Sequence, residues 1–174
     1  MQKFLAFIII TILPFLAVAD GYPINKSIDI KHYSFKLSLF DSTDEIVGEA
    51  QMTIQLKRDG IQSFRLDLVS QTEERKGKGM KVKAILLGNQ SLRFSHDKDE
   101  LVIQLPAAST AGTEISIHIL YQGVPFDGLR IGATKFGDRS FFNENWPNRT
   151  RHWLPTIDHP YDKATSEFIV TAPA

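Results

Sequence analysis

The 174-residue sequence contains no cysteine. Disulfide bonds, zinc sites with thiolate ligands and cysteine nucleophiles are therefore all excluded. Net charge is also absent, because 20 basic side chains balance 20 acidic ones. A generally basic nucleic-acid-binding protein and an acidic disordered tail are both excluded by this balance. With 43% hydrophobic and 10% aromatic residues, the chain has enough apolar material for one compact domain with a core.

Several sequence patterns of known catalytic sites are missing as well. The chain has no His-Glu-x-x-His pair, no Gly-x-Ser-x-Gly motif, no phosphate-binding glycine loop and no dinucleotide-binding fingerprint. His152, Asp158 and His159 could be imagined as a metal cluster, but loop residues bonded to the backbone are the simpler interpretation. The residues alone therefore predict no catalytic residue, no metal ligand and no cofactor in this chain.

Only the N-terminus carries a long apolar run. A lysine precedes it, residues 4–18 are apolar apart from one threonine, and the run ends in Ala17-Val18-Ala19, which suits a signal peptidase. A membrane anchor is the alternative, but about fifteen residues fall short of the roughly twenty that cross a bilayer. We therefore expect residues 1–19 to be a signal peptide and the mature domain, 20–174, to be exported. It would be periplasmic, secreted or held at the cell surface, with no membrane association after cleavage.

The remaining sequence shows no run of apolar residues at the spacing of an amphipathic helix. Instead, apolar and polar residues alternate along it. Alternation with period two is typical of half-buried strands. It predicts strands over 33–39, 46–56, 64–68, 80–87, 91–95, 100–105, 114–121 and 167–171. Asp59-Gly60 predicts a tight turn. Seven or eight short strands at this spacing favour an antiparallel sandwich or an open barrel.

Two segments break the alternation. Residues 71–79 are predicted to be a charged loop, whose basic residues could bind an anion. A solvated hairpin is the favoured interpretation, because Glu73 and Glu74 lie among the basic residues Arg75, Lys76, Lys78, Lys81 and Lys83. Residues 123–160 are rich in Gly, Pro, Asn, Asp and aromatics, and we expect no regular strand there. Long structured loops on a β scaffold often carry binding residues.

The C-terminal third carries a more specific series of residues. Arg151-His152-Trp153-Leu154-Pro155 is followed by Asp158-His159-Pro160, by Asp162-Lys163-Ala164-Thr165, and then by a strand. This series resembles the N-terminal domain of aminopeptidase-N-like zinc metallopeptidases, the gluzincins. His32-Tyr33-Ser34-Phe35, Gly48 and Tyr121-Gln122-Gly123 also fit that domain. The resemblance covers essentially all of residues 28–174.

The resemblance implies an all-β fold, a saddle-like antiparallel β-sandwich of about seven to nine strands with a long loop-rich segment near the C-terminus. Such a domain closes one side of the cleft of a zinc-bearing catalytic domain. In these enzymes a zinc-bound water attacks the peptide and a glutamate acts as general base. The motifs for both lie in that next domain, so zinc is implied for the full-length relative and not for this chain. The implied partners are the catalytic domain of the same polypeptide and the N-terminus of a peptide substrate.

The resemblance also suggests where a substrate would be held. Typical members place a Gln or Glu shortly before the arginine-aromatic segment, because an ammonium group needs a facing oxygen. Counting back from Arg151, that position holds Trp146, which cannot accept such a hydrogen bond. Glu144 lies two residues earlier, on the same face of an extended segment, and could substitute. Glu144 and Trp146 are therefore the candidate substrate-binding residues, with a solvent-exposed loop glutamate as the alternative for Glu144.

The surrounding residues have simpler expected roles. We expect Arg151 and Asp158 to form an internal ion pair or to anchor turns. The aromatic residues of this region are expected to pack against the core or against a neighbouring domain rather than to form a ligand cage. They are Phe141, Phe142, Trp146 and Trp153.

Two hypotheses about function remain open. The first is a non-catalytic, cleft-capping N-terminal domain of an exported zinc metallopeptidase. The second is a stand-alone secreted β-sandwich that acts as a binding or interaction module. The chain ends at Ala174, directly after a strand and before either catalytic motif, which favours the first. The first hypothesis also expects an exposed apolar face on the isolated chain, whereas the second expects a monodisperse protein.

Overall fold

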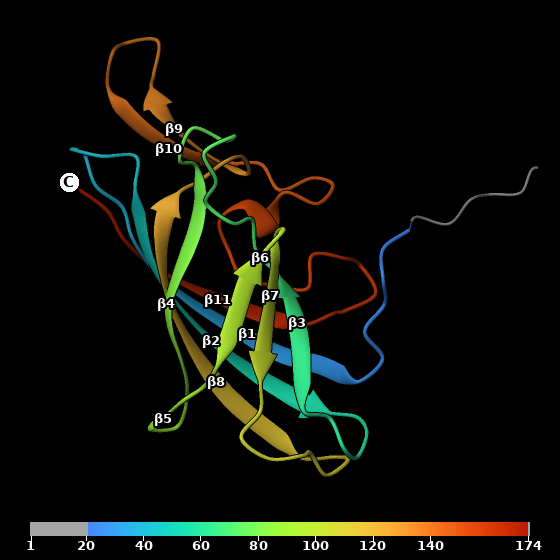
Figure 1. Cartoon of the computed structure of the whole chain (residues 1–174). Helices are drawn as coiled ribbons and strands as arrows, with labels where there is room; N and C mark the ends of the chain where they lie inside the picture. The colour runs from blue at the N-terminus through green and yellow to red at the C-terminus, as the bar shows by residue number, and fades with distance from the viewer. Residues whose placement is uncertain (1–20, 174) are drawn as a thin grey trace, which may run out of the picture.

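The computed structural model describes residues 21–173, so the expected signal peptide of residues 1–19 lies outside the described residues. The described part contains eleven strands and one short 3-10 helix, η1 (Thr150–His152) (Figure 1). The strands are β1 (Ile28–Ser38), β2 (Ile46–Leu56), β3 (Ser63–Asp67), β4 (Gly79–Leu87), β5 (Gln90–Ser91), β6 (Phe94–Asp97), β7 (Glu100–Gln104), β8 (Glu114–Val124), β9 (Leu129–Ala133), β10 (Arg139–Asn143) and β11 (Thr165–Thr171). Within residues 21–173, no helix has the length and apolar character needed to cross a membrane.

A six-stranded sheet forms one layer, with strand order β11-β1-β2-β8-β4-β5. Its strands β1, β2 and β8 have 11 residues each and alternate between buried and more exposed positions. This pattern arises because successive side chains of a strand point to opposite faces, and only one face of the sheet is covered. The covered face supplies fully buried core residues, among them Ile30, Ile54, Ile117 and Ile119.

A three-stranded sheet, β3-β7-β6, packs in front of the large sheet (Figure 1). Its buried side chains Phe64, Leu66, Leu101 and Ile103 belong to the same hydrophobic cluster as the covered face of the large sheet. The fold is therefore a β-sandwich around one core, which confirms the predicted fold class.

Every strand expected from the alternation is present, with one change. The stretch 91–95 is divided into β5 and β6 by Leu92-Arg93. The Leu92 N–H donates to the Ile85 carbonyl of β4 at 2.8 Å, whereas the Arg93 carbonyl accepts from the Gln104 N–H of β7 at 2.9 Å. The chain therefore leaves the large sheet and enters the small sheet between these two residues.

The pairing of β11 differs from a purely antiparallel arrangement. β11 lies beside β1 and runs parallel to it, with Phe168 opposite Phe35. The other strand pairs of the described chain are antiparallel. Parallel neighbours need a long crossover connection, and here all other strands lie between β1 and β11 in the sequence.

The expectation that residues 123–160 contain no regular strand was wrong. β9 and β10 form a hairpin in this segment, with its turn closed by a bond from the Thr134 N–H to the Asp138 carbonyl at 2.7 Å. One face of the hairpin contacts the core through Leu129 and Ile131, but most of its other residues are exposed to solvent, so the alternation in its sequence is short. Arg139 ties the hairpin to the loop after β1, donating to the Phe40 carbonyl and to Asp44.

Candidate functional site

A buried carboxylate organises the segment that resembles the peptidase domain. Asp67, at the end of β3, is only 3% exposed. It accepts hydrogen bonds from the Tyr22 hydroxyl at 2.5 Å and the Asp158 N–H at 3.0 Å. The guanidinium groups of Arg65 and Arg151 lie 3.6 and 3.8 Å from its oxygens and also contact the Tyr22 ring. These five residues are called the Asp67 cluster below.

The Asp67 cluster fixes the chain after η1 onto β3. The Arg151 N–H and its Nε both donate to Asp158, at 3.1 and 3.2 Å, as an internal pair was expected to do. The backbones of Asp67 and Thr156 exchange two hydrogen bonds, at 2.7 and 3.1 Å. Burial and the hydrogen bond to Asp67 raise the pKa of Tyr22, so its hydroxyl remains a donor at neutral pH. The cluster is a structural anchor, because its polar groups bond to one another.

The imagined metal cluster does not assemble. The His152 ring stacks on Phe126, whereas the His159 ring stacks on Tyr22. The described residues contain no group of three or more His, Asp or Glu side chains placed to hold a metal ion. Zinc therefore does not fit the residues of this chain that the structure describes.

Glu144 and Trp146 lie together on the loop that follows β10. The Glu144 N–H donates to the Gly128 carbonyl at 2.8 Å, and its carboxylate accepts from the Trp146 N–H at 3.1 Å. Both side chains are exposed, Trp146 to 79%. Asn145, between them, instead accepts a hydrogen bond from the buried Trp153 indole at 3.0 Å. The loop is thus held from within while Glu144 and Trp146 face outward.

Two neighbouring hollows lie beside this loop, and both are lined by Phe168 of β11. The apolar groove has a volume of about 280 Å³. It is lined by Leu37, Leu39, Leu129, Phe141, Asn143, Trp153, Phe168 and Val170. The second groove, of about 380 Å³, has both apolar and polar lining residues. It shares Phe168 with the apolar groove, and its polar residues include Asn145, Asp158, His159 and Asp162. Glu144 and Trp146 line neither hollow, although their neighbours Asn143 and Asn145 line one each.

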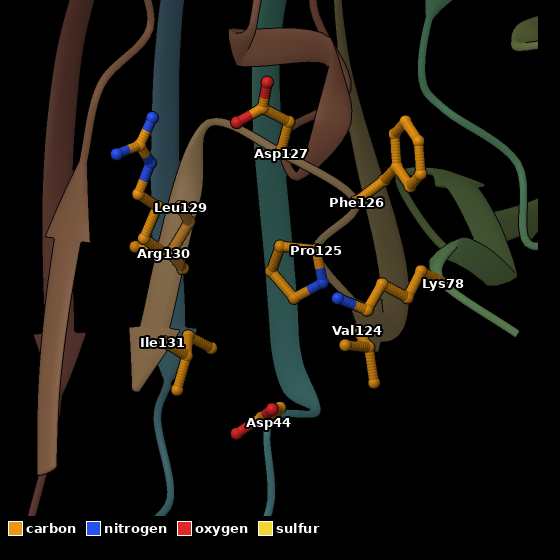
Figure 2. A pocket seen from close by; sticks show the side chains of 9 residues that line it. All are labelled: Asp44, Lys78, Val124, Pro125, Phe126, Asp127, Leu129, Arg130 and Ile131. Atoms are coloured by element: carbon orange, nitrogen blue, oxygen red, sulfur yellow. The ribbon is translucent and has the colours of Figure 1, made fainter. Parts of the chain in front are cut away.

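A third hollow, of about 200 Å³, lies between the end of β8 and β9 (Figure 2). Asp127 and Asp44 lie at its two ends, and both carboxylates are already paired, with Arg149 at 3.4 Å and Arg139 at 2.7 Å. The charges around it do not converge on one point.

The basic loop before β4 is partly neutralised. Arg75 forms two hydrogen bonds with the Asp99 carboxylate, at 2.6 and 2.7 Å, and a third with the Ser70 carbonyl. This arrangement removes Arg75 from a possible anion-binding patch. The segment is a turn-rich loop and not a hairpin, because the flanking residues Ser70 and Met80 form a parallel bridge.

Asp162, which lines the second groove, should make the stability of the protein depend on pH. Asp162 is half-buried and accepts a 3.3 Å hydrogen bond from the Ile30 N–H, and burial raises the pKa of its carboxyl. The folded protein then binds this proton more tightly than the unfolded chain, so stability is lost as pH rises through the raised pKa. We expect Asp162→Asn to raise the melting temperature at pH 7, with a gain that shrinks as pH falls towards 4.

Asp29→Asn is the matched control, because the pKa of Asp29 is shifted in the opposite direction. Hydrogen bonding to Lys31 lowers the pKa of Asp29, so its contribution is present above the ordinary aspartate pKa and is lost in acid. This variant should slightly lower the melting temperature at pH 7. Thermal unfolding of both variants at several pH values measures these changes in melting temperature. A lower melting temperature of Asp162→Asn at pH 7 would contradict the expectation that its carboxylate destabilises the fold.

Comparisons with known proteins agree with the resemblance. No protein-family model matches the chain, and no curated protein matches it by sequence. The crystal structure of an M1 zinc metallopeptidase from Deinococcus radiodurans has a TM-score of 0.68 and 25% identity over 86% of this chain. A variant of that enzyme bound to a Tyr-Ser-Ala substrate gives 0.66 and 24% over 84%. Native leukotriene A4 hydrolase from Saccharomyces cerevisiae gives 0.68 and 16% over 85%, a likeness of fold alone.

The extent of these matches is as informative as their quality. This chain spans 33% of the length of the Deinococcus radiodurans enzyme and 24% of the yeast hydrolase. The predicted resemblance to zinc metallopeptidases is confirmed, and it concerns one domain of such an enzyme.

Proposed function

We propose that this chain, which has the fold of the N-terminal part of an M1 zinc metallopeptidase, is the cleft-capping domain of an exported enzyme of that kind. The observation that carries the proposal is the match over 86% of this chain to only 33% of the enzyme. The domain itself is not catalytic. Zinc, bound by the rest of such a polypeptide, would supply the activated water for peptide hydrolysis.

Exposed apolar surface supports a role inside a larger protein. Trp146, Phe142 and Phe168 are 79%, 59% and 47% exposed, although they are large and aromatic. Phe168 also lines the apolar groove, together with Phe141 of β10, whereas the next residue of that strand, Phe142, points to the opposite face. Apolar patches of this kind on a soluble domain mark interaction surfaces. A docked catalytic domain would cover this side.

Glu144 is proposed to contact the free α-ammonium group of the substrate. Its carboxylate is exposed, and its one hydrogen bond within the described chain, from the Trp146 N–H, leaves capacity for a second donor. The exposed indole of Trp146 supplies an aromatic face next to it, which favours a cation or an apolar side chain. In the full-length enzyme, Glu144→Gln should raise KM for peptides with a free N-terminus more than it lowers kcat. Glu74→Gln, an exposed glutamate on another loop, is the matched control.

The native product tests the proposed function. An antibody to this domain should detect a protein several times the 19.6 kDa of this chain, with one zinc per polypeptide and aminopeptidase activity. Export predicts a mature N-terminus at Asp20, which N-terminal sequencing would detect. A band just below 19.6 kDa would instead favour the second candidate, a stand-alone secreted binding module. Stoichiometric zinc on purified residues 20–174 would contradict the assignment of the metal to another domain.

A further inference from the structure

Trp153 is a core residue that also carries a polar group. Its side chain is only 3% exposed and belongs to the hydrophobic core cluster, whereas Trp146, the other tryptophan of the chain, is 79% exposed. A buried indole N–H needs an acceptor within the protein, because water does not reach it. The Trp153 Nε1–H donates to the side-chain oxygen of Asn145, with 3.0 Å between the heavy atoms. The core is thereby linked directly to the loop that carries Glu144 and Trp146.

Two backbone hydrogen bonds hold the same loop from other directions. The Glu144 N–H donates to the Gly128 carbonyl at 2.8 Å, and the Asn145 carbonyl accepts from the Arg149 N–H at 3.0 Å. Gly128 has a φ of +76° and is tightly packed, because a Cβ there would lie 2.3 Å from the Arg149 carbonyl oxygen and 3.0 Å from the Trp153 ring. Residues 144 and 145 are therefore bonded at three points, and only the bond between Trp153 and Asn145 joins two side chains.

The position of the Glu144 carboxylate depends on this support. The carboxylate accepts a hydrogen bond from the Trp146 N–H at 3.1 Å, but this bond lies within the loop and does not attach the loop to the rest of the domain. A hydrogen bond between a carboxylate and an ammonium group is short, about 2.7–2.9 Å between the heavy atoms. A misplacement of about 1 Å at such a contact can cost about a hundredfold in rate. The three bonds at residues 144 and 145 therefore matter for any ligand of Glu144.

We propose that Asn145 and Trp153 are positioning residues of the substrate site and act through Glu144. The Trp153 indole, anchored in the core, holds the Asn145 side chain, and Asn145 in turn fixes the Glu144 carboxylate at the place of the substrate ammonium group. This inference rests on the proposed function, because Glu144 must contact that group. It adds a role for two residues that act without contacting the substrate.

Removal of the side-chain bond in the full-length enzyme tests this role. Asn145→Leu replaces the acceptor by an apolar group of similar size and leaves the backbone bonds of the loop possible. We expect KM for peptides with a free N-terminus to rise about tenfold, the equivalent of one net hydrogen bond, with a smaller change in kcat. Asn145→Asp keeps an acceptor oxygen at the same place and should keep KM near the wild-type value. Asn148→Leu, at an exposed asparagine of the same loop, is the matched control and should leave KM unchanged.

A combination of two substitutions separates positioning from a general structural effect. Glu144→Ala leaves no carboxylate to position. In that background Asn145→Leu should raise KM by less than about twofold, because residues that act through one contact are not additive. A merely structural role of Asn145 would instead give the same tenfold rise in both backgrounds, about tenfold being the value expected for one hydrogen bond.

The two indole N–H groups test the hydrogen bond without any measurement of activity. Residues 20–174 contain the whole core cluster and both tryptophans. In their NMR spectrum the Trp153 indole N–H should exchange with deuterium far more slowly than that of Trp146, because it is buried and bonded. Asn145→Leu should make this exchange about tenfold faster, whereas Asn148→Leu should not change it.

The outcomes distinguish this inference from the proposed function. A Trp153 indole that exchanges as fast as that of Trp146, or additive effects of Asn145→Leu and Glu144→Ala on KM, would overturn the positioning role alone. An unchanged KM in Glu144→Ala would contradict the ammonium contact, and the positioning role would fall with it even if the indole is protected. If Asn145→Leu does not fold, Trp153→Phe removes the donor in place of the acceptor and should raise KM by the same factor.

Discussion

Asp67→Ala is expected to lower the free energy of unfolding by about 3 kcal/mol, the lower end of the range for breaking a buried ion pair. The change removes the acceptor for the Tyr22 hydroxyl and the Asp158 N–H, and it leaves Arg65 and Arg151 facing each other without a carboxylate between them. The effect stays at the lower end because both guanidinium groups keep contact with water, at 22% and 23% side-chain exposure. Urea denaturation at pH 7 measures it.

A nearby surface pair supplies the control for this prediction. Arg65 also forms a 2.8 Å ion pair with Glu100, whose side chain is half exposed. Exposed pairs contribute at most about 1 kcal/mol, so Glu100→Gln should change the free energy of unfolding by less than that. Tyr22→Phe, which removes only the hydroxyl, should fall between the two, at about 1 to 2 kcal/mol. If Asp67→Ala were no more harmful than Glu100→Gln, the Asp67 cluster would not be the anchor of this segment.

The Asp67 cluster shows what the sequence could not predict. Tyr22 and Asp158 lie 45 and 91 residues away from Asp67 in the sequence, and no local pattern connects them to it. The strand prediction succeeded for the opposite reason. In β2 and β8 one face is buried and the other is open to solvent, so apolar and polar residues alternate along the sequence of each strand. Arg151 and Asp158 were predictable as a pair because they lie seven residues apart in one turn-rich segment.

The same reasoning explains the missed hairpin. β9 and β10 pair only with each other, and Phe142 on β10 is exposed although it is large and apolar. Only Leu129 and Ile131 of the hairpin contact the core, a buried face too short to give a clear period, so composition alone suggested a loop. The residues proposed to touch substrate, Glu144 and Trp146, directly follow this hairpin. They were chosen from the family resemblance, whereas their exposure is seen only in the structure.

Gly48→Ala is expected to lower the free energy of unfolding by about 2 to 3 kcal/mol, because the added methyl group overfills the core. Gly48 lies in β2 opposite Tyr121 of β8, and the tyrosine ring covers it. A Cβ at position 48 would lie 2.2 Å from the Cζ atom of that ring. The ring is fully buried and must move into packed neighbours to admit a methyl group. Gly132→Ala in β9, where no atom lies within 4 Å of the new Cβ, should change stability by less than about 0.5 kcal/mol.

A double-mutant cycle separates this clash from a general preference of the strand for glycine. Tyr121→Leu removes the ring from above Gly48 and leaves a cavity that an added methyl group can partly fill. Gly48→Ala should therefore cost much less in the Tyr121→Leu background, with a favourable coupling energy of about 1 to 3 kcal/mol between the two sites. Additive effects would mean that the backbone of β2, and not the Tyr121 ring, requires the glycine. Strong coupling would show that this glycine, one of the residues behind the family resemblance, is needed because an aromatic side chain from β8 occupies the space of its missing side chain.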